Sequence, residues 1–141
     1  MTPTFKNRIP VQLRFNDVDV IGHVNNTVYF SFFDLGKTTY FEAVRGSHID
    51  WAGVDLVICH IEADFISPIF LKDKIEACTA ITRIGTKSLT MEQAIIDTTT
   101  GQIKCTCRTI MVGFDPATNT SKEISEQWKE AIRAYEQNPE L

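Results

Sequence analysis

The sequence predicts one α+β domain in which a long helix is covered by a curved antiparallel sheet. Two observations carry this prediction: one long segment has helical spacing of its apolar residues, and four segments with strand-like alternation follow it through short connections. The chain has 141 residues, 43% of them hydrophobic and 23% charged, which is typical of one globular domain. We therefore expect a single domain over residues 1–137 and a loose tail over residues 138–141.

The first predicted strand covers residues 11–15. Its apolar residues alternate with polar ones, which is the period of two expected for a strand with one covered face: Val11, Leu13 and Phe15. A polar turn at Asn16-Asp17 ends this strand. The chain then runs through the segment DVDVIGHVNN, in which polar side chains are dense.

The long helix is predicted directly after this segment. Its aromatic residues and one glycine recur at spacings of three, four and seven: Tyr29, Phe32, Phe33, Gly36 and Tyr40. An Asn side chain accepts a hydrogen bond from an unpaired amide of the first turn, so Asn25 or Asn26 is the expected N-cap. Gly46 is the expected stop, and Gly36 allows a sheet to approach the helix closely.

Four strands are predicted over residues 56–65, 74–84, 88–97 and 103–114. Their short connections imply antiparallel neighbours in a meander, because a parallel return needs a crossover of about a dozen residues or more. The strand over 74–84 carries apolar residues on both faces, whereas the helix covers only one. A second subunit is the simplest cover, so we expect a homo-oligomer, either a dimer or a tetramer of paired dimers. A short final helix is predicted with Ser125 as its cap.

The charge and the cysteines limit the class of partner. The formal net charge is −4, so non-specific binding to nucleic acid is not expected, because that binding needs a basic face. No apolar run approaches the ~20 residues of a membrane span, and the first ten residues lack the apolar stretch of a secretory signal. We therefore expect a cytoplasmic protein without membrane contacts. The four cysteines show no CxxC spacing and are expected to be buried free thiols, with no metal site and no cofactor.

Functional side chains are concentrated in residues 17–26, directly before the N-terminus of the long helix. Two carboxylates, an imidazole, a glycine and two side-chain amides lie there. The first amides of a helix are unpaired and carry partial positive charge, which stabilises the oxyanion formed when a carbonyl is attacked. A carboxylate a few residues upstream can supply the nucleophile or the base for the same carbonyl. This combination favours acyl transfer.

The string DVDVIGHVNNTVYF resembles the signature of the hotdog-fold acyl-CoA thioesterases of the 4-hydroxybenzoyl-CoA thioesterase family. The likeness covers nearly the whole chain, continuing through Phe33-Asp34, residues 60–68, Lys72-Asp73 and residues 83–89. It implies the hotdog fold, a long central helix wrapped by an antiparallel sheet. It also implies hydrolysis of an acyl or aroyl thioester to the free acid and coenzyme A.

The resemblance further implies roles for single residues. Asp19 matches the family's catalytic carboxylate, which acts either as a nucleophile or as a general base on water. The backbone amide of Asn26 matches the donor that polarises the thioester carbonyl. Gly22 matches the turn, and His23 and Asn25 match positions that orient the loop or the substrate.

Three further residues are expected to contact the substrate. Tyr29 lies one turn along the helix from the amide of Asn26, and Lys87 beside the Gly85 turn is a candidate for the phosphates of coenzyme A. Ser88 matches a small hydroxyl near the pantetheine arm in relatives. Two alternatives stay open: a hydratase or dehydratase acting on enoyl thioesters, and a non-catalytic acyl-CoA-binding protein. An acyl carrier protein is an alternative carrier to coenzyme A.

Overall fold

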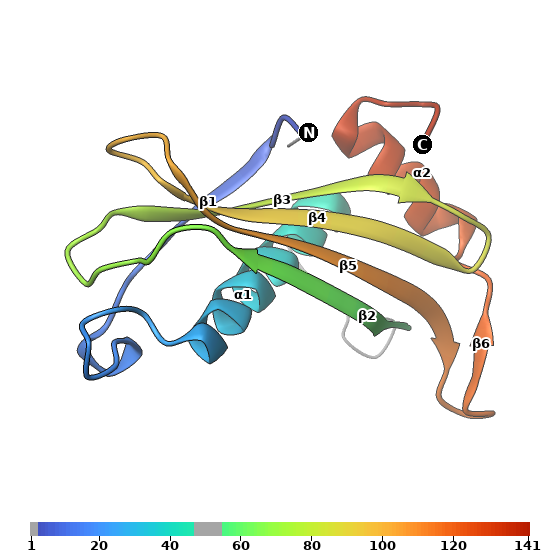
Figure 1. Ribbon diagram of the computed structural model, residues 1–141. Helices are drawn as coiled ribbons and strands as arrows, with labels where there is room; N and C mark the ends of the chain where they lie inside the picture. The colour runs from blue at the N-terminus through green and yellow to red at the C-terminus, as the bar shows by residue number, and fades with distance from the viewer. Residues whose placement is uncertain (1–2, 47–54) are drawn as a thin grey trace.

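The computed structural model describes residues 3–46 and 55–141. The elements in chain order are β1 (Asn7–Val11), a short 3-10 helix (Phe15–Asp17), α1 (Asn26–Arg45), β2 (Leu56–Phe65), β3 (Ile75–Ile84), β4 (Ser88–Asp97), β5 (Ile103–Asp115), β6 (Thr120–Lys122) and α2 (Glu126–Glu136). Figure 1 shows one curved sheet lying across α1, with α2 beside the sheet near the end of β3. This is the hotdog arrangement that the resemblance implies, so the predicted fold class is confirmed.

The sheet is antiparallel, with the strand order β1-β3-β4-β5-β2, and β6 adds to β5. The predicted meander is confirmed for β3, β4 and β5. It is wrong for β2, which pairs with β5 and not with β3. The connection over residues 66–74 is longer than a hairpin loop, so it can carry the chain across the end of the sheet to the opposite edge.

The first strand lies earlier than predicted, over Asn7–Val11, and residues 15–17 form the 3-10 helix. The extended conformation ends because the Asp17 carboxylate accepts a hydrogen bond from the Arg14 amide at 2.8 Å and folds the chain into a turn. Phe15 is therefore 79% exposed and not part of a covered strand face. Pro10 is tolerated inside β1 because β1 is an edge strand that pairs only with β3.

Both ends of α1 lie where local signals predict them. The Asn25 side chain caps the helix by accepting a hydrogen bond from the Thr27 amide at 3.0 Å. The helix ends at Gly46, whose φ of 100° favours glycine. Gly36 faces the sheet so closely that a Cβ atom there would lie 2.9 Å from Thr79 Oγ1. The predicted close approach of helix and sheet is confirmed.

The core has two large clusters along α1 and a small one on the other face of the sheet. The first lies at the N-terminal half of α1 and includes Val24, Tyr29, Phe33 and Ile69. The second lies at the C-terminal half and includes Tyr40, Phe41, Trp128 and Ile132. The third is built from Phe5, Cys78, Ala80 and Ala94. The N-terminal segment therefore covers part of the face for which a second subunit is expected.

The remaining predictions for the fold concern the final helix, the cysteines and the C-terminal tail. The final helix and its Ser125 cap are confirmed. Three of the cysteines are buried free thiols, but Cys59 is exposed, because it lies in the edge strand β2 at a β-bulge. Leu141 packs partly against the second cluster, and its carbonyl accepts a hydrogen bond from Arg133 Nε. The domain bounds of 1–137 and 138–141 stay a prediction.

In the described ranges, residues 3–46 and 55–141, neither helix has the length and apolar character that crossing a bilayer requires.

Candidate active site

The two carboxylates of the loop before α1 have different surroundings. Asp17 is only 3% exposed, and its carboxylate pairs with the amide and guanidinium of Arg14. Its carbonyl accepts the Asn25 amide at 2.9 Å, which joins the start of the loop to the helix cap. Asp17 therefore holds the loop together, and its buried carboxylate is already engaged by Arg14.

Asp19 organises the tip of the loop and is exposed. Its Oδ1 atom accepts hydrogen bonds from the amides of Ile21 at 3.0 Å and His23 at 3.3 Å. Its amide donates to the His23 carbonyl at 2.8 Å, and Gly22 closes the turn with a φ of 84°. The carboxylate is thus held by the backbone while it stays open to solvent, as a nucleophile or base requires.

A small pocket of about 170 Å³ opens at the N-terminus of α1. One wall consists of three predicted site residues together with Val24: His23, Asn26 and Tyr29. The other wall is the segment after β2, residues 65–68. Asp19 does not line this pocket and lies beside it, on the loop that His23 closes.

The pocket combines a polar helix start with aromatic walls. Asn26 occupies the first helical position, where the backbone amide has no partner within the helix. Tyr29 is 2% exposed and packs edge to face on Phe65, with ring centroids 5.0 Å apart. Burial raises the pKa of the Tyr29 hydroxyl, so Tyr29 is protonated at neutral pH. A carbonyl at the helix start would meet amide donors, and an apolar group would meet the rings.

Lys87 and Ser88 lie at the opposite end of the sheet from the Asp19 loop. Lys87 lies in the β3–β4 turn and Ser88 begins β4, and the Gly85 amide donates to the Ser88 carbonyl across this turn. The start of β3 lies beside the loop before α1, and its ten residues span about 30 Å. Figure 1 shows the loop before α1 and the β3–β4 turn at opposite ends of the sheet. One copy of the chain therefore does not bring Lys87 or Ser88 to Asp19.

Sequence reasoning missed the wall formed by residues 65–68. Phe65 and Ile66 are 44% and 58% exposed, although both are large apolar residues. Their position just before Pro68, at the end of a strand, was the available signal, because exposed apolar residues beside a polar cluster often mark a binding surface. Within the described part of the chain, no three His, Cys, Asp or Glu side chains gather as metal ligands would.

The family model and the similar solved structures both point to thioesterases. Residues 13–132 match the thioesterase-like superfamily. A thioesterase from Thermus thermophilus, solved with coenzyme A and Zn, has a TM-score of 0.85 and 29% identity over 96% of this chain and 97% of that chain. No curated protein matches in sequence.

Two more distant structures share the fold. A 1,4-dihydroxy-2-naphthoyl-CoA thioesterase from Synechocystis has a TM-score of 0.79 and 17% identity over 89% of this chain and 93% of that chain. A 4-hydroxybenzoyl-CoA thioesterase mutant complexed with 4-hydroxybenzoyl-CoA has a TM-score of 0.78 and 20% identity over 89% of this chain and 96% of that chain.

Proposed function

The chain belongs to the thioesterase-like superfamily and is a thioester hydrolase, and we propose that it hydrolyses an acyl or aroyl ester of coenzyme A to the free acid and coenzyme A. The observation that carries this proposal is the arrangement at the start of α1. A backbone-held, exposed carboxylate at Asp19 lies beside a pocket lined by Asn26, the first residue of α1.

The proposed reaction uses these two groups on one carbonyl. The amide of Asn26 donates to the thioester oxygen and stabilises the negative charge that develops on it. Asp19 either attacks the carbonyl carbon or removes a proton from the attacking water. In both cases the carbon–sulfur bond breaks, the oxygen of water ends in the acid, and a proton passes to the leaving thiolate. His23, Gly22 and Asn25 shape the loop that carries Asp19.

We propose that the acyl group lies against Tyr29 and the aromatic wall of the pocket. Coenzyme A is the proposed carrier, with acyl carrier protein as the alternative. Lys87 and Ser88 remain candidates for the phosphates and the pantetheine arm, but they must then come from a second copy of the chain, because they lie at the far end of the sheet.

The assembly is proposed to be a homodimer or a tetramer of paired dimers. The outer edge of β2 has no strand beside it in the described chain, and apolar Ile58 and Ile61 on this strand are 44% and 40% exposed. A second copy would cover both features. Sedimentation of the wild-type protein measures the mass, and a monomer at micromolar concentration would reject this part of the proposal.

A cytoplasmic location is also proposed and agrees with three buried free thiols.

The activity is tested by thiol release from a panel of aromatic, short, medium and long acyl-CoA substrates. Asp19→Asn is expected to lower kcat/KM at least about 100-fold, because a positioned acid or base contributes about that much or more. The matched control is Asp115→Asn. Asp115 Oδ1 accepts the Ala117 amide in the same way that Asp19 Oδ1 accepts the Ile21 amide, but Asp115 lies at the end of β5. Near-normal turnover by folded Asp19→Asn would reject the role of Asp19.

The same assay separates the alternatives. A hydratase or dehydratase would change the absorbance of an enoyl-CoA without releasing thiol. A binding protein would retain acyl-CoA with neither change. Either result in the wild-type protein would replace the proposed function.

A further inference from the structure

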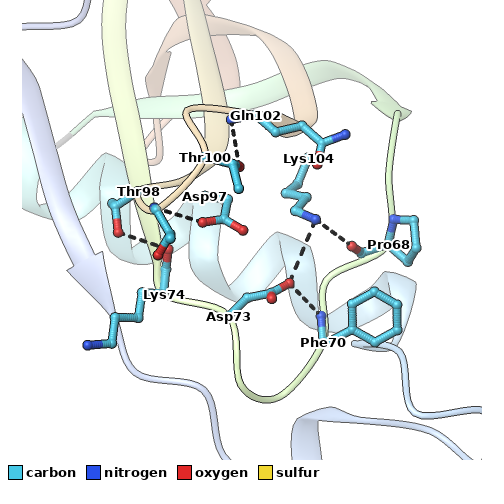
Figure 2. Close-up of polar contacts among 10 residues, drawn as sticks. Pro68, Phe70, Asp73, Lys74, Asp97, Thr98, Thr100, Gln102 and Lys104 are labelled. Atoms are coloured by element: carbon cyan, nitrogen blue, oxygen red, sulfur yellow. Dashed lines mark hydrogen bonds and ion pairs between the residues drawn. The ribbon is translucent and has the colours of Figure 1, made fainter.

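Lys104 is a buried lysine near the candidate site. It is 5% exposed, and its ammonium lies 3.7 Å from Asp73 Oδ2 and donates to the Pro68 carbonyl at 3.0 Å (Figure 2). A buried charge is costly unless it is paired, so the site must supply partners for the ammonium. Both of these partners come from the connection between β2 and β3.

A β-bulge turns Lys104 toward that connection. Ile95 pairs with Cys105 but Ile96 pairs with Ile103, so Lys104 is an extra residue in β5. Cys105 belongs to the cluster under α1, whereas Ile103 packs with the cluster on the other face. In a regular strand residues 103 and 105 would share one face. The bulge breaks this alternation and re-aims the lysine, as bulges beside functional sites do.

Lys104 and Asp73 together hold both ends of the segment over residues 66–73 by hydrogen bonds. The Lys104 carbonyl accepts the amides of Ile66 at 2.9 Å and Ser67 at 3.1 Å. At the other end the Asp73 carboxylate accepts the Phe70 amide at 2.9 Å, while the Lys104 ammonium holds Pro68 between them. Figure 2 shows Asp73, Phe70 and Pro68 arranged around the lysine ammonium.

The loop before α1 packs against this segment over residues 66–73. The Val24 amide donates to the Ile69 carbonyl at 2.8 Å, and His23 forms a β-bridge to Phe70. The His23 and Phe70 rings meet edge to face at 5.1 Å. His23 in turn donates its amide to Asp19. A chain of contacts therefore runs from Lys104 through residues 69–70 to Asp19 in the loop before α1.

We infer that Lys104 and Asp73 are positioning residues for the thioesterase site, acting through residues 68–70 to hold the His23–Val24 backbone and hence Asp19 in place. This inference rests on the proposed function. A buried ion pair adds little net stability, because removing two charges from water offsets their attraction. The geometry that the pair fixes is the better explanation for it, since a displacement of about 1 Å costs about 100-fold in rate.

The test is Lys104→Met, which keeps the apolar stem and removes the ammonium. In the folded variant, thiol release is expected to lose about 10- to 100-fold in kcat with a smaller change in KM, because Asp19 is displaced while contacts to the acyl carrier stay in place. Hydrogen exchange of the Val24 amide is expected to be at least about tenfold faster, because its acceptor Ile69 is no longer held. A role in general packing would not produce this split between kcat and KM.

The matched control is Lys129→Met. The Lys129 side chain is 11% exposed, against 7% for Lys104, and pairs with Glu126 on α2 at 3.6 Å, away from the loop before α1. This control is expected to leave kcat and Val24 exchange unchanged. If Lys104→Met does not fold, Asp73→Asn/Lys104→Met removes both charges and leaves no unpaired one, with the same expected losses.

Several results would overturn the inference that Lys104 and Asp73 position the loop. Wild-type kcat in the Lys104 variant overturns the inference, whether or not Val24 exchanges faster. Unchanged Val24 exchange or an equal loss of kcat in Lys129→Met also overturns it. If the wild-type protein releases no thiol from any substrate of the panel, the proposed function fails by itself. The exchange measurement then still decides whether the pair holds the loop, and unchanged Val24 exchange overturns this inference as well.

Discussion

The two ends of α1 are built differently. At its C-terminal half, Tyr40 and Phe41 pack edge to face on Tyr135 and Trp128 of α2. The Tyr40 hydroxyl also donates to Glu136 Oε2 at 2.5 Å. At its N-terminal end the helix meets a polar loop whose tip is fully exposed at Val20, which has 103% relative exposure.

With the proposed active site at the loop end, this difference separates stability from chemistry. The aromatic end buries large side chains, so substitutions there should lower mainly the free energy of unfolding. The loop end leaves amides and a carboxylate accessible, as substrate binding requires, and is held by hydrogen bonds and the Lys104–Asp73 pair. Substitutions at the two ends should therefore affect different measurements.

Trp128→Ala should have the largest effect on stability. The side chain is 8% exposed and contacts Phe41 and the Arg45 guanidinium, so its removal leaves a cavity. We expect a loss of about 3–5 kcal/mol in the free energy of unfolding, measured by urea titration. Below the unfolding midpoint, kcat for thiol release should stay near the wild-type value. A comparable loss of kcat in the folded variant would show that the two ends are not separate.

Gly36→Ala tests the middle of α1, where the two regions meet. Alanine favours the helix by about 1 kcal/mol, but overpacking a core costs about 1–3 kcal/mol. The new Cβ would lie 2.9 Å from Thr79 Oγ1 and 3.1 Å from Gln93 Nε2, and both side chains are buried. We expect a net loss of about 1 kcal/mol in urea titration. Thr79→Ala in the same chain should recover part of this loss by making room; no recovery would contradict the steric reason.

Val20→Ser should have the smallest effect. Val20 is fully exposed, and exposed substitutions usually change stability by less than about 0.5 kcal/mol. The free energy of unfolding should therefore match that of the wild type. A larger loss, if it depends on protein concentration, would show that a second copy covers the tip of the loop.

Local signals placed α1, α2 and β4 well, because an N-cap, a stop glycine and a short turn act through neighbouring residues. Asn25 and Gly46 bound α1 through contacts within a few residues. The same reasoning misplaced β1, since the alternation over residues 11–15 did not reveal that Asp17 would capture the Arg14 amide. In the candidate site, the residues before α1 were predicted, whereas the wall at residues 65–68 was missed, because its place beside the helix start follows from the packing of β2 in the sheet.

The sequence by itself determined the fold class, the long helix and the group of polar residues before it. Periodicity and capping depend on residues close together in the chain, so they can be read without the partner strand. The tertiary structure alone decided that β2 pairs with β5, that Lys87 lies far from Asp19, and that a bulge aims Lys104 at the segment under the loop. These features depend on the register between strands distant in sequence, and register follows from the packing of the whole sheet.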